Sequence, residues 1–551
     1  MHRFVARVAA LALPLTAYLS PLTAAPLAGQ QPASGTRVAR AISGEVMRAH
    51  LEFLADDALE GRAPGTRGGL IAAKYVAAQF ERLGLEPAGD DSSYFHKVPI
   101  ISLTPNPQAS IVADSATPLE FKQDYVLWSM HDDSVVSVAG DLVFAGYGIV
   151  APEYQWNDYE GLDVKGKVVV VLVNTPGLRD STLFKGKILT YYGRWTYKIE
   201  EAERRGAAGI LIVHTPESAT YGWATVTGSW TGPQTRVERK PGPLMVAGWL
   251  SEGAADRVLA PAGGLERLTD AASRRGFKPV ELKARLGATV RSTVRHSETY
   301  NVIGRLPGRA AKAAQAVIIG AHYDHLGISL PVNGDSIYNG ALDNGSGTAG
   351  MLATAEAFVR TGVRTPRSLI FMAFAAEESG LLGSTAYAAR PTVPLKNIAA
   401  VLNMDVMNLY GRTKDIAALG MDQSSLGKAF TAAAKQEGLR VTVNEDALIK
   451  GSFFRSDHFP FARAGVPALS LESGLDFVGK PAGWGKEKQK DYTDHRYHQP
   501  GDELLAWYTY DGAVQQLGVI ARTAIAVAES PAQPLWAAGS EFRAAGEARV
   551  K

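Results

Sequence analysis

The stretch Gly320-Ala-His-Tyr-Asp-His-Leu-Gly327, followed by Leu342-Asp-Asn-Gly-Ser-Gly347, decides the fold class of this 551-residue chain. In the first segment a His and an Asp, separated by one residue, follow directly on the apolar run Val317-Ile-Ile319. In the second segment another Asp lies in a glycine-rich turn that is predicted to begin a helix. A short apolar run that ends in polar residues indicates a buried strand of an α/β sheet.

Three further segments carry candidate metal ligands: Ala375-Ala-Glu-Glu-Ser379, Asn403-Met-Asp405 and Tyr497-His-Gln-Pro-Gly-Asp502. Imidazole and carboxylate groups suit zinc and similar divalent ions, and a set rich in carboxylates can hold two of them. The chain has no cysteine, so any such site is built from histidines and carboxylates. The sequence therefore indicates a metal-dependent hydrolase.

The candidate ligands follow predicted strands. Short apolar runs predict strands over 317–321, 369–375 and 398–404, and helical periodicity predicts helices over 346–359, 380–389 and 511–528. Strands that alternate with helices imply a βαβ sheet. His322, Glu377, Glu378 and Asp405 each lie just past the carboxyl end of a predicted strand, which is where open α/β sheets bind ligands.

The ordered motifs HxD, LDNGSG, EE, NMD and YHxPxD resemble those of the M28 family of zinc aminopeptidases, which carry two co-catalytic zinc ions. The main resemblance covers residues 286–530, and residues 41–104 are similar to the amino-terminal part of the same catalytic domain. The resemblance implies a three-layer αβα zinc-peptidase fold with a mixed, mainly parallel sheet. It also implies two Zn²⁺ per chain, although other divalent metals suit the same ligand types.

The resemblance assigns a role to each motif residue. His322 and Asp405 would hold one zinc ion. Glu378 and His498 would hold the other, and the Asp343 carboxylate would bridge the two ions. Glu377 would be the general base that takes a proton from water. Asp324 would accept the second ring N–H of His322 and so fix the orientation of that ring.

Other residues are predicted to support the site or to line it. Ser456-Asp-His458 resembles a recurrent SDH segment of the family, which places Asp457 and His458 near the ligands but outside the ligand set. His325 is predicted to be a loop or supporting residue. The segment 471–497, with Trp484, is predicted to form a loop over the site. Replacing Trp484 by Ala would then change substrate preference more than stability.

A second domain is predicted between the two catalytic segments. Residues 105–285 include the strands 141–148, 167–173 and 209–213 and resemble the β-rich protease-associated (PA) domain that is often inserted in this family. No catalytic constellation lies in this part of the sequence, so its expected role is to cover the cleft or to shape substrate access, or is purely structural. Residues 531–551 are predicted to be a loosely packed tail.

The amino terminus resembles an export signal. Basic residues precede the apolar run 8–19, and small residues follow it, so residues 1–25 are predicted to be a signal peptide and residues 26–40 a disordered leader. No other segment is long and apolar enough for a membrane span, and a net charge of +2 does not indicate nucleic acid as a partner. We expect a periplasmic or secreted protein of unknown oligomeric state.

The expected activity is removal of the amino-terminal residue from peptides. A carboxypeptidase or dipeptidase of the same family would need basic residues for the substrate carboxylate, and Arg455 is the candidate beside the SDH segment. Glutaminyl cyclases share the fold with one catalytic zinc, so metal stoichiometry separates them. A peptidase-like binding protein without metals is the alternative outside the enzymes, and the complete ligand set with Glu377 argues against it.

Overall fold

The computed structural model describes residues 33–112, 116–238 and 240–551. The predicted signal peptide and residues 26–32 of the predicted leader lie outside these ranges. None of the helices in the described ranges is long and apolar enough to cross a membrane.

The centre of the fold is a sheet in which four neighbouring strands run parallel, in the order β20-β17-β13-β16. The three predicted strands are confirmed, and β12 and β18 flank the parallel strands in antiparallel orientation. The strands are β12 (Val280–Leu306), β13 (Ala316–His322), β16 (Ser368–Phe374), β17 (Ile398–Met404), β18 (Asp415–Leu419) and β20 (Ala468–Ser473). The sheet is mixed and mainly parallel, as the sequence predicts.

Helices cover both faces of this sheet, because successive strand residues point to opposite sides. Val317 and Ile319 belong to one buried core and Ile318 to another. The first core is covered by α2 (Gly44–Leu54), α3 (Arg67–Arg82), α9 (Ser346–Thr361), α11 (Leu426–Gln436) and α15 (Asp511–Glu529). The second is covered by α10 (Leu382–Ala389) and α13 (His458–Arg463). This is the three-layer αβα arrangement.

Two expectations about the ends of the described chain are wrong. Residues 34–40 are not a disordered leader, because helix α1 (Ser34–Ala41) packs against α15 and fully buries Val38. The segment after residue 531 is not loosely packed either. Trp536 and Phe542 are buried in the second core, and the indole N–H of Trp536 donates to the carbonyl of Gly465 at 3.0 Å.

The PA-like part is a second set of parallel strands in the same sheet, in the order β5-β8-β9-β11, with antiparallel β4 at the edge. Its elements are β4 (Tyr125–Ser129), β5 (Val135–Phe144), β8 (Val168–Leu172), β9 (Gly209–Val213), β11 (Val246–Leu250), α4 (Trp195–Arg204), α5 (Pro216–Ala219), α6 (Trp223–Trp230), α7 (Glu252–Leu259) and α8 (Leu265–Ala272).

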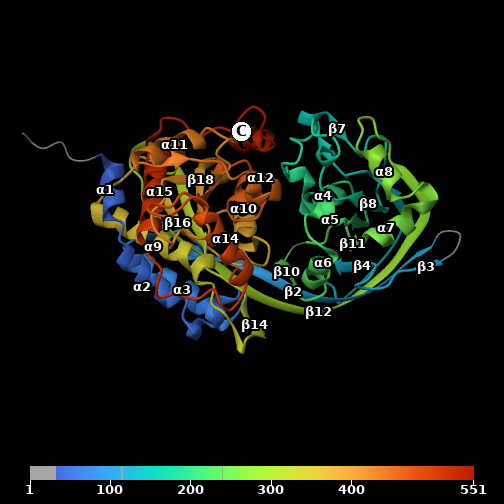
Figure 1. Ribbon diagram of the computed structural model, residues 1–551, viewed down its shortest axis with the longest axis horizontal. Coiled ribbons are helices and arrows are strands. Elements are labelled where there is room, and N and C mark those ends of the chain that lie inside the picture. The colour runs from blue at the N-terminus through green and yellow to red at the C-terminus, as the bar shows by residue number, and fades with distance from the viewer. Residues whose placement is uncertain (1–32, 113–115, 239) are drawn as a thin grey trace, which may run out of the picture. The chain divides into compact units, whose positions relative to one another are not determined.

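Two long strands connect this part to the catalytic sheet, as Figure 1 shows. β2 (Phe95–Val112) and β12 pair antiparallel from Phe95 with Val302 to Val112 with Arg285. The predicted domain boundaries after residues 104 and 285 fall inside these two strands. The chain therefore passes between the two parts along paired strands.

The remaining α-helices and strands complete the described chain. They are β1 (Glu86–Pro87), β3 (Ala116–Pro118), β6 (Val150–Ala151), β7 (Trp156–Asn157), β10 (Gln234–Val237), β14 (Gly327–Val332), β15 (Asp335–Tyr338), β19 (Arg440–Val441), α12 (Glu445–Lys450), α14 (Trp484–His495) and α16 (Arg543–Val550).

Candidate metal centre

The parallel strands bring the predicted ligands to one edge of the sheet. His322 is the last residue of β13, Glu377 and Glu378 follow β16, and Asp405 follows β17 directly. Because these strands are parallel neighbours, their carboxyl ends meet. Asp343 reaches the same place from the glycine-rich turn that precedes α9.

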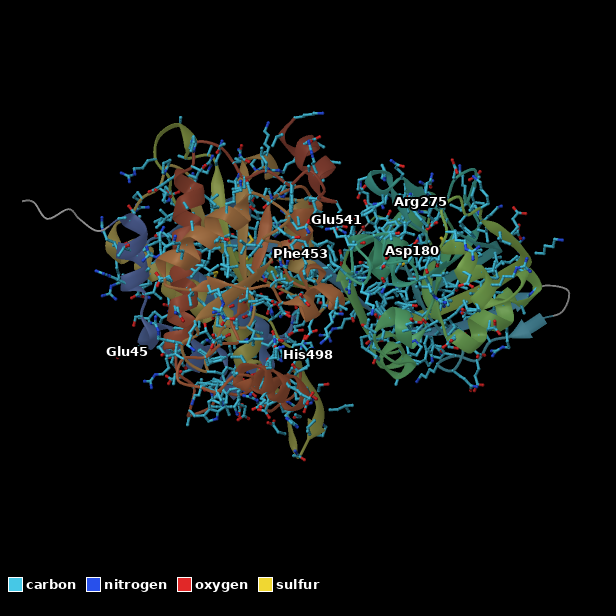
Figure 2. All side chains as sticks on the ribbon, turned by 45° about the horizontal axis from the view of Figure 1, so that its top comes forward. Glu45, Asp180, Arg275, Phe453, His498 and Glu541 are labelled. Atoms are coloured by element: carbon cyan, nitrogen blue, oxygen red, sulfur yellow. The ribbon has the colours of Figure 1, made fainter. Side chains whose placement is uncertain are left out.

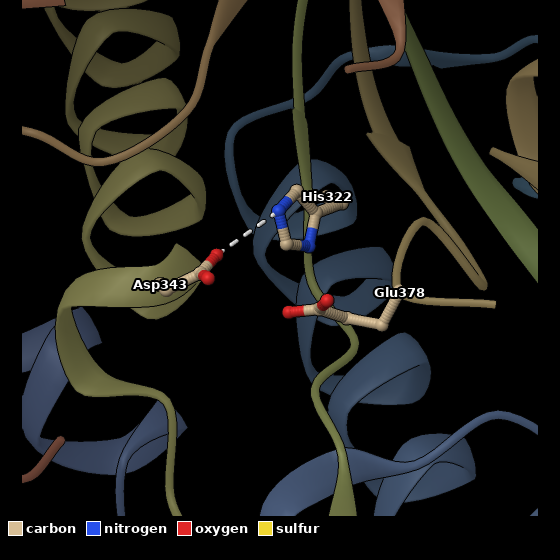
Figure 3. A group of neighbouring side chains, drawn as sticks. All are labelled: His322, Asp343 and Glu378. Atoms are coloured by element: carbon tan, nitrogen blue, oxygen red, sulfur yellow. Dashed lines mark ion pairs between the residues drawn. The ribbon is translucent and has the colours of Figure 1, made fainter. Parts of the chain in front are cut away.

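His322 lies between two of the carboxylates. Its Nε2 is 3.4 Å from Oδ1 of Asp343 and 3.3 Å from Oδ1 of Asp405. Figure 3 shows the ion pair with Asp343 and the carboxylate of Glu378 facing the same space. Ligand atoms within 4.8 Å of one another form two sets, His322 with Asp343 and Glu378, and His322 with Glu377 and Asp405.

His498 completes the other side of the cluster. Its Nε2 is 3.0 Å from Oε2 of Glu378 and 3.4 Å from Oδ2 of Asp343, yet neither contact has the geometry of a hydrogen bond. Asp343 therefore directs one oxygen to each imidazole, which is where a bridging carboxylate has to lie. These residues fit two adjacent divalent cations with one shared ligand.

The carboxylates create a strongly negative field at this edge of the sheet. Burial alone would lower the pKa of His322, but Glu377, Asp405 and Asp343 raise it well above the usual value. Burial also opposes charge on His498, and its contacts with Asp343 and Glu378 nevertheless raise its pKa to about 10. A site that favours positive charge on the buried imidazole of His322 and on the partly exposed imidazole of His498 favours bound cations for the same reason.

Glu377 is a buried carboxylate whose surroundings favour its protonated form. Burial raises the pKa of Glu377 well above its usual value; His322 opposes this, and the charges of Glu378 and Asp405 add to it. Its backbone N–H and that of Glu378 donate to the Asp324 carboxylate at 3.1 and 3.4 Å. Asp324 thus holds the turn that carries both glutamates.

The predicted hydrogen bond between the Asp324 carboxylate and the His322 ring is absent in the described structure. Nδ1 of His322 is 3.9 Å from Oδ1 of Asp324 but 3.2 Å from the backbone carbonyl oxygen of the same residue. The Asp324 carboxylate instead accepts hydrogen bonds from the backbone N–H groups of Glu377 and Glu378. Asp324 therefore orients His322 through its backbone.

Asp502 supports the bridging residue and was given no role by sequence reasoning. Its carboxylate accepts the backbone N–H groups of Leu342 and Asp343 at 3.0 and 2.9 Å, and the hydroxyl of Tyr492 donates to it at 3.2 Å. Asp502 belongs to the quoted YHxPxD motif, so its position in that motif was the available signal. Its effect is to fix the backbone from which the Asp343 side chain projects.

Two further ligands are held by buried polar neighbours. Nδ1 of His325 lies 2.8 Å from Oε1 of Glu378, so His325 has the supporting role that was one of its two predicted alternatives. The Ser456 hydroxyl donates to Oδ2 of Asp405 at 2.7 Å, and the side-chain amide of Asn403 donates to the Ser456 hydroxyl at 2.7 Å. Both carboxylates are therefore restrained before any cation binds.

Arg62 lies beneath the site and was missed by sequence reasoning. It is fully buried, and its guanidinium donates to the carbonyl oxygens of Tyr323 at 2.7 Å and Gly340 at 2.9 Å. Burial lowers its pKa to about 10, and Asp324, Asp502 and Asp343 act in the opposite direction. Its charge thus offsets part of the carboxylate charge while it ties the two ligand-bearing loops together.

Three predicted supporting or substrate-lining residues do not line the cavity in the described structure: Asp457, His458 and Trp484. Asp457 is buried, and its carboxylate accepts a hydrogen bond from the Ser384 hydroxyl at 2.5 Å. Burial raises the pKa of Asp457 to about 8; the charge of His322 opposes this rise, and the charges of Asp324 and Asp405 add to it. His458 is buried against the Phe453 ring. Trp484 packs on Phe477, and the expected loop is partly helix α14.

The ligands open into a cavity of about 1250 Å³. Asp343, Glu377, Glu378 and Asp405 line it, together with residues of the PA-like part from helices α4 and α6. Figure 2 labels His498 at the site and Glu541, whose carboxylate accepts the backbone N–H of Tyr191 in the PA-like part at 2.9 Å. The cavity is large enough for several peptide residues.

Comparison with known proteins agrees with this geometry. Residues 301–522 match the model of peptidase family M28, and residues 138–257 match the model of the PA domain. Residues 301–522 are therefore similar to peptidase family M28, and residues 138–257 are similar to the PA domain.

Curated relatives are similar over part of their length. Leupeptin-inactivating enzyme 1 of Streptomyces exfoliatus is 31% identical over 209 residues, which are 37% of this chain and 43% of that protein. Aminopeptidase YwaD of Bacillus subtilis is 27% identical over 337 residues, which are 58% of each chain. The chain thus spans about half the length of these relatives.

Solved structures are similar over most of the chain at low identity. An aminopeptidase from Aneurinibacillus sp. strain AM-1 is 18% identical with a TM-score of 0.45, over 91% of this chain and 97% of that one. A peptidase M28 precursor from Shewanella amazonensis is 21% identical with a TM-score of 0.42, over 91% and 97% of the two chains.

Proposed function

We propose that this protein is a two-zinc aminopeptidase that hydrolyses the amino-terminal peptide bond of peptides. The observation that carries the proposal is the position of Asp343, with one carboxylate oxygen toward His322 and the other toward His498. Asp405 would complete the set at His322, and Glu378 the set at His498. The names of the curated relatives, which include aminopeptidases, support the same activity.

The chain's own residues divide the work of hydrolysis. Zinc, when bound, polarises the scissile carbonyl and acidifies water. Glu377 accepts the proton from the attacking water and returns it to the leaving amine. Asp502, His325 and Ser456 hold Asp343, Glu378 and Asp405 in place, so little reorganisation is needed during the reaction. The acidic groups of the cavity also favour the protonated amine of a peptide substrate.

The first test compares three substrate classes: free-amine aminoacyl p-nitroanilides, amino-blocked peptides, and peptides assayed for release of the carboxyl-terminal residue. We expect hydrolysis of the free-amine class, its loss after chelation, its return with zinc, and two metal ions per chain. Release of carboxyl-terminal residues would make the protein a carboxypeptidase. Absence of both turnover and bound metal would make it a binding protein.

The role of Glu377 has a separate test. Replacing it by Gln is expected to lower kcat by about 10²–10⁴-fold, because proton transfer is lost. Metal content should stay at the wild-type level, whereas Glu378→Gln should reduce it. Glu487→Gln, an exposed glutamate on α14, is the control and should leave both quantities unchanged. A Glu377→Gln variant with near-normal kcat would refute the role.

We also propose that the protein is exported. The support is the basic and apolar pattern of residues 1–25, which lie outside the described part of the chain. Fractionation of cells that express the full chain, beside a variant lacking residues 2–25, tests this. We expect the full chain outside the cytoplasm, cleaved near residue 25, and the shortened variant inside. Equal cytoplasmic retention of both would refute export.

A further inference from the structure

Arg194 is a partly buried cation for which the described structure shows no counter-ion. It precedes helix α4 of the PA-like part and lines the same cavity as the metal centre. Its Nε is buried and has no hydrogen-bond partner. Burial, followed by the positive charge of Arg455, lowers the pKa of Arg194 to about 10. The buried Nε–H group has no acceptor, and a bound anion would supply one.

Arg455 approaches from the catalytic part. It lines the cavity and is exposed to solvent, and within the described ranges no hydrogen bond or ion pair of its side chain is found. The next residue in the chain, Ser456, donates to the Asp405 carboxylate, and the charge of Arg455 acts on Arg194 across the cavity. Two arginines of like charge therefore meet in one cavity, from two different parts of the chain.

Two acidic side chains that line the cavity near α4 have other partners in the described structure. Glu200 pairs with Arg463 and accepts the Tyr191 hydroxyl, and Glu238 pairs with His296 at 2.8 Å. The groups that act on the charge of Arg194 are Arg455, Tyr191 and Tyr221, and none of them is a carboxylate. The described chain thus supplies no internal partner for this positive charge.

Helix α4 adds to the positive potential. It is ten residues long, no side chain caps its amino terminus, and its first turn carries no acidic residue. Trp195 and Thr196 of that turn line the cavity. The free N–H groups and the dipole of a helix amino terminus favour an anion at this position.

We propose that Arg194 and Arg455, with the amino terminus of α4, form a subsite that binds a carboxylate of the peptide substrate. The proposal rests on the proposed peptidase function and adds a preference within it. The carboxylate is either the carboxyl terminus of a short peptide or an acidic side chain beyond the scissile bond. A bidentate arginine contact suits either group equally.

The test measures kcat/KM for matched pairs of peptides that differ in one carboxylate. The first pair is Ala-Ala-Ala and its carboxyl-terminal amide. The second is the amides of Ala-Asp-Ala and Ala-Asn-Ala. Alanine p-nitroanilide, which has no carboxylate, reports basal hydrolysis. We expect the carboxylate member of at least one pair to be favoured by about tenfold to a hundredfold, the usual range for a charge-assisted contact.

Arg194→Gln and Arg455→Gln should each abolish this discrimination and leave hydrolysis of alanine p-nitroanilide near the wild-type rate. Arg463→Gln is the matched control, because it removes the same charge from the same cavity but from an arginine that is already paired with Glu200. It should keep the discrimination.

Each outcome separates the subsite from the activity. Discrimination only in the first pair identifies the peptide terminus, and only in the second pair an acidic side chain. Hydrolysis of the p-nitroanilide without discrimination in either pair overturns the subsite and leaves the peptidase intact. No hydrolysis of any substrate would refute the proposed function instead. If the Arg463→Gln control also lost the preference for the carboxylate peptide, the preference would come from the overall positive charge of the cavity. This result would also overturn the subsite.

Discussion

Asp502 decides where the bridging carboxylate points, because it accepts two consecutive backbone N–H groups, of Leu342 and Asp343. In Asp502→Asn the amide nitrogen would face one of these donors, so a buried N–H would lose its partner. We expect zinc affinity to fall by about 10–100-fold, as is usual when a group that orients a metal ligand is removed. Activity titrated against buffered free Zn²⁺ would show a shifted midpoint and near-normal activity at saturation.

The neighbouring substitution Glu503→Gln is the control for the loss of one negative charge, and its zinc midpoint should match that of the wild type. An Asp502→Asn protein with an unchanged midpoint would show that the Asp343 turn holds its own shape. A protein that stays inactive at saturating zinc would mean that Asp502 serves the reaction beyond metal binding.

At the scale of elements, helix α1 contributes stability through one buried side chain. Val38 is fully buried against the helices of the first core, whereas Arg40 on the same helix is exposed. Val38→Asp buries an unpaired carboxylate and should lower the free energy of unfolding by about 2 kcal/mol or more. Arg40→Asp introduces the same residue in solvent and should change it by about 0.5 kcal/mol or less. Urea unfolding of both variants measures this; equal midpoints would show that α1 is not part of the folded core.

The sequence predicted the elements whose signal is local. β13, β16 and β17 are apolar runs that end in polar residues, and their parallel order places His322 and Asp405 at one edge. Helix α1 escaped prediction because its sequence is polar and only Val38 is buried, by partners far along the chain. Arg62 and Asp502 escaped prediction for a related reason. Both form hydrogen bonds with backbone groups that lie 159 or more positions away, and residue type and spacing do not reveal such contacts.

At the scale of the whole molecule, Glu541 links the tail to the PA-like part and makes stability depend on pH. It accepts the backbone N–H of Tyr191 at 2.9 Å, and burial raises its pKa from 4.5 to about 7. Between these values the folded chain keeps a proton that the unfolded chain has released. The stability contributed by this proton is present below pH 4.5 and is lost as the pH rises to about 7, by at most about 1.4 kcal/mol per pH unit.

Glu541→Gln keeps an oxygen for the Tyr191 N–H and removes the titration. Relative to the wild type, this variant should therefore be more stable at pH 8 than at pH 5, when both proteins are unfolded in urea under the same chelating conditions. Glu547→Gln is the matched control, since Glu547 lies on the exposed helix α16 and pairs with Arg543. Its stability relative to the wild type should not rise from pH 5 to pH 8. A constant difference between Glu541→Gln and the wild type across this range would mean that Glu541 is ionised in the folded protein, and the link between the tail and Tyr191 would then be a charged one.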